Sequence, residues 1–193
     1  MRDRSPPEIV SKIQIPRDIF NKRVNEAFIQ KIMSLVFKDT VWRAGNPQKF
    51  EPDYFCDDIP FEFTLASNKQ KKKNYIQQIR FDQYSTEDAE EQMIAMIYAA
   101  INSKLQKNYS VENIHLCILC LMDMTFWVLG EYGSLTCSQT DHKRQELFDK
   151  IKKKYINSGS FANIFIIFPD IAEKWWVWDV LSGEKKSVLM ISE

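Results

Sequence analysis

Glycine, histidine and net charge are all scarce in this chain, and each shortage excludes a class of function. Five glycines leave little room for a phosphate-binding or dinucleotide-binding loop, and no P-loop or nucleophile elbow occurs. The two histidines, His115 and His142, are too far apart to suggest a histidine-based zinc site. Lys plus Arg equals Asp plus Glu at 26 each, so any evidence for nucleic-acid binding must be local.

Long hydrophobic runs are also missing. No stretch of about 18 apolar residues occurs, so we expect no membrane-spanning segment. The residues around Arg2 and Pro7 lack the apolar region of a signal peptide. Cys117 and Cys120 form a C-x-x-C, but inside an apolar run and without a second pair, which favours buried thiols over zinc or redox chemistry. We therefore expect a cytoplasmic protein.

The residues that are present predict one α/β domain over residues 1–193. Hydrophobic residues make up 45% of the chain, enough for a core. Helical spacing predicts a helix from Asp18 to about Phe37, with Asn21 and Asn25 nearer its buried side than Glu26. Its inward stripe is expected to be Phe20, Val24, Ala27, Phe28, Ile32 and Leu35.

The rest of the chain alternates between helical and extended patterns. We expect helices at 72–83, 85–106 and 141–156, and strands at 41–44, 113–122, 161–168 and a final one at 175–181. The strands at 113–122 and 161–168 are almost continuously apolar, which is typical of strands covered on both faces. Together these patterns predict a central mixed β-sheet flanked by helices, with a C-terminal extension of helix and strands at about 141–193.

A hairpin at 52–65 is the most informative feature. If Asp57 and Asp58 form its tip, antiparallel pairing sets Cys56 opposite Ile59 and Asp53 opposite Glu62. Two carboxylates would then share one face of the sheet, with Cβ atoms about 5 Å apart. Like charges so placed repel each other, and a hard divalent cation such as Mg²⁺ is a natural compensator.

The order of these elements, with Pro52-Asp53 and Glu62-Phe63-Thr64 on neighbouring strands, resembles the PD-(D/E)XK or restriction-endonuclease-like nuclease superfamily. The matching core is about residues 18–122. The resemblance implies a DNA nuclease in which Asp53, Glu62 and the main-chain carbonyl of Phe63 bind Mg²⁺ or Mn²⁺. The bound ion would activate a water that attacks a phosphodiester.

Thr64 occupies the position at which that family normally has a catalytic lysine. Some members supply the lysine from another element, and Lys104 is the best substitute because it flanks the buried stripe of the helix at 85–106. We hypothesise that its ammonium reaches the acids. The alternative is a lysine that extends to water from the end of an apolar stripe.

The resemblance also suggests accessory residues. The family often has a further acid on its first helix, where Glu26 lies, although the helical projection places Glu26 opposite the predicted stripe and towards solvent. Gln77 and Gln78 match a glutamine that positions phosphate or metal in some relatives. A basic run just after the Glu-x-Thr strand is a candidate either for phosphate contacts or for a solvated turn: Lys69, Lys71, Lys72 and Lys73. A second group of lysines is expected on the solvated face of an amphipathic helix: Lys150, Lys152, Lys153 and Lys154.

Two alternatives to the nuclease stay open. One is a non-catalytic binding module for nucleic acid or protein on the same scaffold, and both Thr64 and the balanced charge favour it. A third reading is an ordinary hairpin whose acids both face water.

The final strand is rich in tryptophan, which favours core or interface packing over base stacking at Trp175, Trp176 and Trp178. Aromatic residues exposed near the C-terminus would permit a homodimer.

Overall fold

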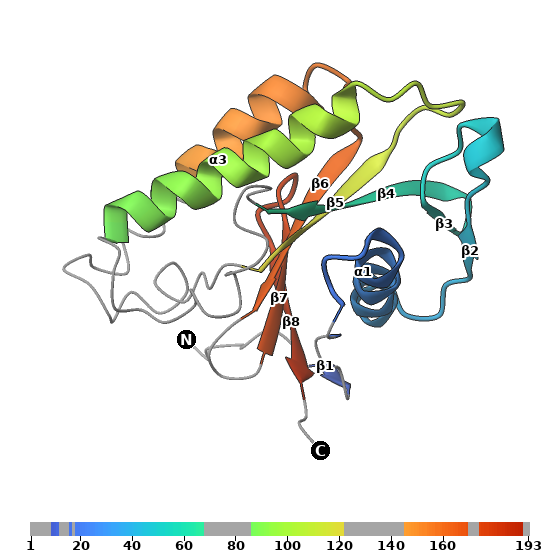
Figure 1. The fold of residues 1–193 in the computed structure, drawn as a ribbon, viewed down its shortest axis with the longest axis horizontal. Coiled ribbons are helices and arrows are strands. Elements are labelled where there is room, and N and C mark those ends of the chain that lie inside the picture. The colour runs from blue at the N-terminus through green and yellow to red at the C-terminus, as the bar shows by residue number, and fades with distance from the viewer. Residues whose placement is uncertain are drawn as a thin grey trace.

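The computed structural model describes residues 9–11, 16, 18–67, 86–121, 145–169 and 174–190. These residues form one eight-stranded mixed sheet with helices on both faces (Figure 1), in the strand order β1-β8-β7-β6-β5-β4-β3-β2. The predicted mixed sheet flanked by helices is confirmed. Within this part of the chain, no helix is both long and apolar enough to cross a membrane.

The first half of the described chain contains helix α1 (Lys22–Val36), strand β2 (Trp42–Ala44), the 3₁₀-helix η1 (Pro47–Lys49), strands β3 (Tyr54–Cys56) and β4 (Ile59–Ala66), and helix α3 (Thr86–Leu105). β2, β3 and β4 form an antiparallel meander at one edge of the sheet. Over the described residues, the order helix, three strands, helix and buried strand agrees with the sequence prediction, and the predicted helix at 72–83 lies outside the described residues.

The second half contains β5 (His115–Cys120), a helix at 145–151 that continues as the π-helix η3 (Lys152–Ile156), β6 (Asn163–Pro169), β7 (Lys174–Asp179) and β8 (Lys185–Met190). β4, β5 and β6 run parallel in the middle of the sheet. The predicted last strand, β7, is followed by β8, which pairs with it and with the short N-terminal strand β1 (Ile9–Ser11). β7 is therefore not the final strand.

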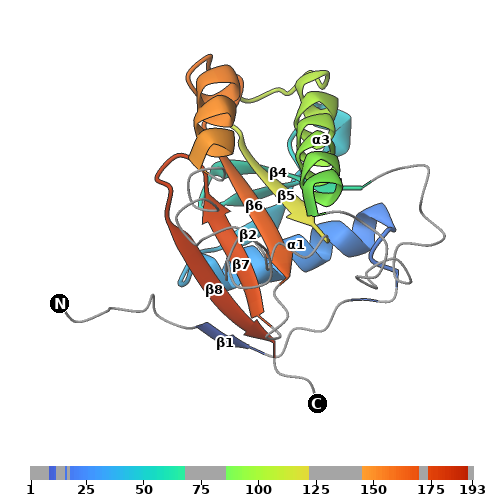
Figure 2. The same cartoon turned by 90° about the vertical axis from the view of Figure 1, so that its left-hand side faces the viewer.

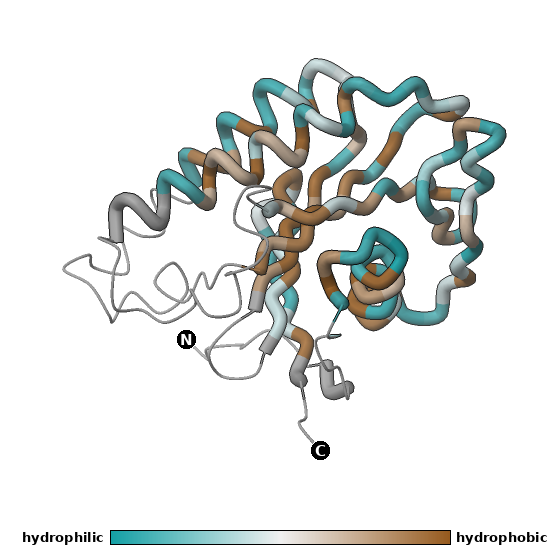
Figure 3. The backbone as a smooth tube through the Cα atoms, in the orientation of Figure 1, coloured by the Kyte–Doolittle hydropathy of each residue, from teal (hydrophilic) through white to brown (hydrophobic). Residues whose placement is uncertain are grey.

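Two hydrophobic cores lie on opposite faces of the sheet. α3 and the helix at 145–156 cover one face, and α1 covers the other (Figure 2). The strands between them are apolar along their length, while the outward sides of the helices are polar (Figure 3). Trp178 packs in the first core and Trp175 in the second, each almost fully buried.

The tryptophans therefore serve as core residues, as the alternation predicted. Trp176 packs partly buried against the same core as Trp178. Trp175 and Trp178 are at most 1% exposed, so they offer no surface to a second copy. The suggestion of a dimer through exposed aromatics near the C-terminus is wrong for these two residues.

Helix α1 begins later than predicted. Asn21, not Asp18, is its N-cap, and its side chain accepts a hydrogen bond from the amide of Arg23 at 3.0 Å. The buried residues of α1 are Asn25, Phe28, Ile29, Ile32 and Met33. This face is rotated from the predicted stripe, since Ala27 is exposed and Ile29 and Met33 are buried instead.

Candidate functional site

The predicted register of the hairpin is confirmed. Tyr54 pairs with Phe61, Phe55 with Pro60 and Cys56 with Ile59. Asp57 and Asp58 form the tip with positive φ angles of 46° and 70°, which suits the twist of a tight hairpin. Asp53 lies immediately before β3, so continuing the ladder by one residue places it opposite Glu62 on β4, a strand that both α1 and α3 contact.

Glu62 is completely buried, an unusual position for a carboxylate. Its Oε1 atom accepts hydrogen bonds from Nζ of Lys104 and Nζ of Lys107, both from the C-terminal end of α3 or just beyond it. Among the described residues, its Oε2 atom has no hydrogen-bond partner. The third reading of the sequence, in which both acids face water, is wrong for Glu62.

Asp53 connects the two helices. Its Oδ2 atom accepts a hydrogen bond from the amide of Phe63 at 2.9 Å and lies 3.8 Å from Nζ of Lys104. Its Oδ1 atom lies 3.7 Å from Nζ of Lys22 on α1. Burial alone would raise the pKa of Asp53, but the charge of Lys104 and the bond from Phe63 outweigh it and hold this pKa below its usual value.

Lys104 is 7% exposed, and its ammonium reaches both acids. The hypothesis that the ammonium of Lys104 reaches the two carboxylates is therefore confirmed, whereas its role in catalysis stays a prediction. Burial lowers the pKa of Lys104, and the charges of Glu62 and Asp53 only partly offset that effect.

Glu26 lies beside Asp53 and not in open solvent. Its side chain is 15% exposed, and its Oε1 atom lies 3.2 Å from Nζ of Lys22. Burial, followed by the charge of Asp53, raises the pKa of Glu26. The projection that turned Glu26 to solvent is wrong because the buried face of α1 is rotated to include Ile29 and Met33, which places Glu26 at about 100° from Asn25, at the margin of that face.

A cleft of about 230 Å³ opens between α1, the end of β4 and α3. Lys22, Glu26, Thr64 and Lys104 contribute polar groups to its wall, and Phe20 and Leu65 contribute apolar ones. Thr64 therefore faces the same space as Lys104, although it has no ammonium to contribute. The cleft reaches Lys104 and Lys22, which pair with the two acids.

The structure thus brings together Asp53, Glu62, Lys104, Phe63, Thr64 and Glu26. Sequence reasoning missed Lys22, Lys107 and Tyr109, which also face the acids. Tyr109 is partly buried near both carboxylates, and burial followed by their charges raises its pKa. The spacing of Lys107 one turn after Lys104 was the signal in the sequence that could have identified Lys107.

Several candidates lie outside the described residues: Gln77, Gln78, His142 and the lysines at 69–73.

The charges in this cluster are balanced. Three carboxylates (Glu26, Asp53, Glu62) face three ammonium groups (Lys22, Lys104, Lys107). Over the part of the chain that the structure describes, no group of three or more His, Cys, Asp or Glu side chains is arranged to hold a metal ion. Binding of an ion between these acids therefore requires that the exposed lysines move away from the carboxylates.

Lys22 is the lysine with most freedom to move, since its side chain is 68% exposed, while that of Lys107 is 41% exposed. Lys107 pairs with the fully buried Glu62, so its departure costs more than the loss of an ion pair between two exposed groups. With both turned to water, three carboxylates and Lys104 carry two net negative charges, and Oε2 of Glu62 has no partner within the described chain. Carboxylate oxygens are the ligands that Mg²⁺ and Mn²⁺ prefer, but the described acids are not arranged to hold an ion in this structure.

No protein-family model, curated protein or solved structure matches this chain. Its function is consequently inferred from the site itself.

Proposed function

We propose that this protein is a Mg²⁺- or Mn²⁺-dependent nuclease of the PD-(D/E)XK type that hydrolyses DNA phosphodiester bonds. One observation carries the proposal: a buried lysine on α3 reaches both Asp53 and Glu62, at 3.8 Å from the former, where Thr64 leaves the usual position without an amine. The order of elements around it, from α1 to β5, supports the same assignment.

Each residue has a role in this proposal. Asp53 and Glu62, with the carbonyl of Phe63, would hold the ion, and Glu26 would support it from α1. The ion would polarise the attacking water and neutralise charge on the phosphate. Lys104, whose ammonium reaches both acids, would orient that water and stabilise the negative charge that develops during attack. Lys22 and Lys107 would turn outward and meet phosphate groups of the substrate.

The test is incubation of the purified protein with plasmid DNA and Mg²⁺ or Mn²⁺. We expect metal-dependent cleavage that falls by about 100-fold or more in Asp53→Asn and in Lys104→Ala, as when other charge-stabilising groups are removed. Lys49→Ala changes an exposed lysine on η1 and should leave the rate unchanged. Circular dichroism verifies that each variant is folded. No cleavage by the folded wild type with either metal, or full activity of Lys104→Ala, contradicts the proposal.

A non-catalytic binding module is the second candidate. The observation that favours it is the pair of ammonium groups on Oε1 of Glu62, which already neutralises this acid. In that case Asp53→Ala should preserve binding of a DNA duplex, and Mn²⁺ should give no binding signal in calorimetry. A nuclease should instead bind Mn²⁺ in the wild type and lose that binding in Asp53→Ala.

A further inference from the structure

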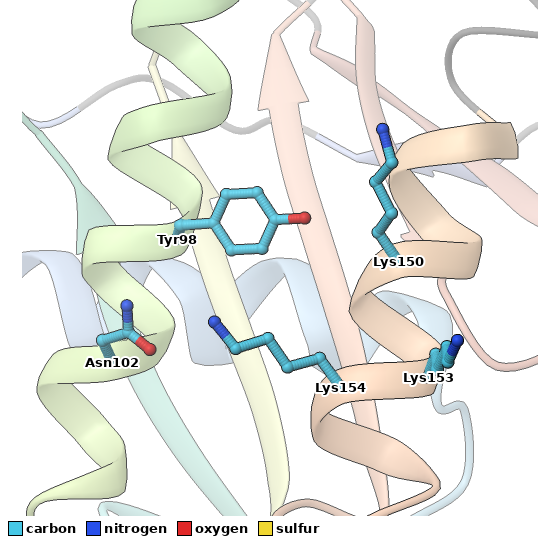
Figure 4. Close-up of a pocket in the computed structure, with 5 residues that line it drawn as sticks. All are labelled: Tyr98, Asn102, Lys150, Lys153 and Lys154. Carbon is cyan, nitrogen blue, oxygen red and sulfur yellow. The ribbon is translucent and has the colours of Figure 1, made fainter.

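A second polar groove lies away from the acid cluster, between α3 and the helix at 145–156. It has a volume of about 570 Å³ and is lined by Tyr98, Asn102, Lys150, Lys153 and Lys154. All five side chains offer hydrogen-bond donors, and none is a carboxylate. Figure 4 shows Tyr98 projecting from α3 towards the opposite helix, and Lys154 extending back towards α3.

The positive charge of this groove is poorly compensated. Nζ of Lys150 lies 4.0 Å from Oε1 of Glu146, at the limit of an ion pair, and both side chains are more than half exposed. A second acid on the described part of this helix, Asp149, accepts a hydrogen bond from Gln145. Lysines concentrated in a concave surface repel one another, and an anion relieves that repulsion.

Several contacts hold the groove in shape. Nζ of Lys154 lies over the rings of Tyr98 and Tyr155, 5.8 Å and 5.0 Å from their centroids. The hydroxyl of Tyr155 donates to Oδ1 of Asn102 at 3.0 Å, which leaves the Asn102 amide nitrogen as a donor. Lys153 and Lys154 belong to the π-helix η3, a rare conformation that is frequent at functional sites.

We propose that this groove binds an anion with two or more phosphate groups. Lysine ammonium groups recognise phosphate as point charges, and the Asn102 amide and the Tyr98 hydroxyl add directed donors. The volume falls in the range of ligand sites, about 300–1,000 Å³, and exceeds the need of one phosphate. The phosphates belong either to a free polyphosphate or to successive nucleotides of a nucleic acid.

The experiment measures binding by the full chain in EDTA, so that neither metal nor cleavage contributes. One arm titrates pyrophosphate by calorimetry, and the other follows fluorescence anisotropy of a labelled single-stranded 12-nucleotide DNA. The test variant is Lys150→Gln/Lys153→Gln/Lys154→Gln. The control is Lys38→Gln/Lys49→Gln/Lys186→Gln, which removes the same charge from exposed lysines elsewhere.

We expect the test variant to lose at least about tenfold in affinity and the control less than about threefold. For the DNA arm, the slope of log affinity against log salt should also fall by about 0.7 for each lost phosphate contact. Loss in the pyrophosphate arm identifies a free polyphosphate, and loss in the DNA arm alone identifies a nucleic-acid backbone. Equal losses in both variants, or no binding in either arm, overturn the proposal. The result does not depend on Asp53, Glu62 or Lys104, so it stands apart from the test for cleavage.

Discussion

At the scale of single residues, the site shows that an ammonium group can reach the two acids from a distant part of the sequence. Thr64 cannot supply a cation from β4, yet Lys104 supplies one from a helix 40 residues later. A buried carboxylate without a partner is costly, and removing one member of a buried pair typically destabilises a protein by about 3–5 kcal/mol. The pairing of Lys104 with Glu62 therefore contributes to the stability of the fold as well as to any chemistry at this site.

The pH dependence of stability tests the placement of Glu26. Its pKa is raised in the folded chain, so its favourable contribution is present below the unfolded pKa and is lost as pH rises through the folded pKa. Glu26→Gln removes this titration. We expect the melting temperature of the variant, relative to wild type, to increase as pH rises from the ordinary pKa of glutamic acid, 4.5, through the raised pKa of Glu26 in the folded chain.

Thermal unfolding followed by circular dichroism at several pH values provides the measurement. Glu112→Gln, which changes an exposed acid, is the control and should give a difference from wild type that stays flat over this range. A flat difference for Glu26→Gln as well would mean that Glu26 is in water, as the helical projection indicates.

At the scale of elements, the hairpin and α1 show what periodicity can and cannot predict. The register of β3 with β4 followed from a tight turn and a period of two, because a slip by one residue would have turned every apolar side chain outward. The buried face of α1 was predicted less well. Apolar residues surround much of that helix, and only contact with the sheet selects Ile29 and Met33 over Ala27.

The tip of the hairpin carries backbone strain that can be relieved. Asp58 has φ = 70° and an exposed side chain, and glycine tolerates that conformation best. Asp58→Gly should raise the free energy of unfolding by about 0.5–1 kcal/mol, measured by urea denaturation.

Asp57→Gly is the matched comparison. Oδ1 of Asp57 accepts a hydrogen bond from the amide of Val41 at 2.8 Å, which the substitution removes. It should therefore gain less stability than Asp58→Gly, or lose some. A larger gain for Asp57→Gly would contradict this account of the turn.

At the scale of the whole molecule, β5 joins the two cores. Leu116, Ile118 and Cys120 face the core under α3, and Cys117 and Leu119 face the core under α1. The two cysteines of the C-x-x-C consequently point to opposite faces and are both fully buried. The expectation of buried thiols is confirmed for Cys56, Cys117 and Cys120.

Because both cores share these strands, damage to one should open the other. Ile97→Ala, in the core under α3, should destabilise the fold by about 2–5 kcal/mol. Labelling of Cys117 by a thiol reagent should then accelerate at least about tenfold, although this thiol lies on the other face of the sheet. Mass spectrometry after digestion locates the label.

Ile59→Ala is the control for this experiment, since Ile59 is 43% exposed and belongs to neither core. It should leave the labelling rate of Cys117 nearly unchanged. Unchanged labelling in Ile97→Ala, despite its lower stability, would show that the two cores open independently.

The sequence by itself determined the layered α/β architecture, the hairpin register and the burial of the central strands, because these follow from local periodicity and turn chemistry. Only the tertiary structure decided the surroundings of Glu62. Lys104, Lys107, Lys22 and Glu26 converge there from α1 and the C-terminal end of α3, and their approach depends on how two helices pack on opposite faces of one sheet. Such packing is set by contacts between distant residues, which no local pattern in the chain records.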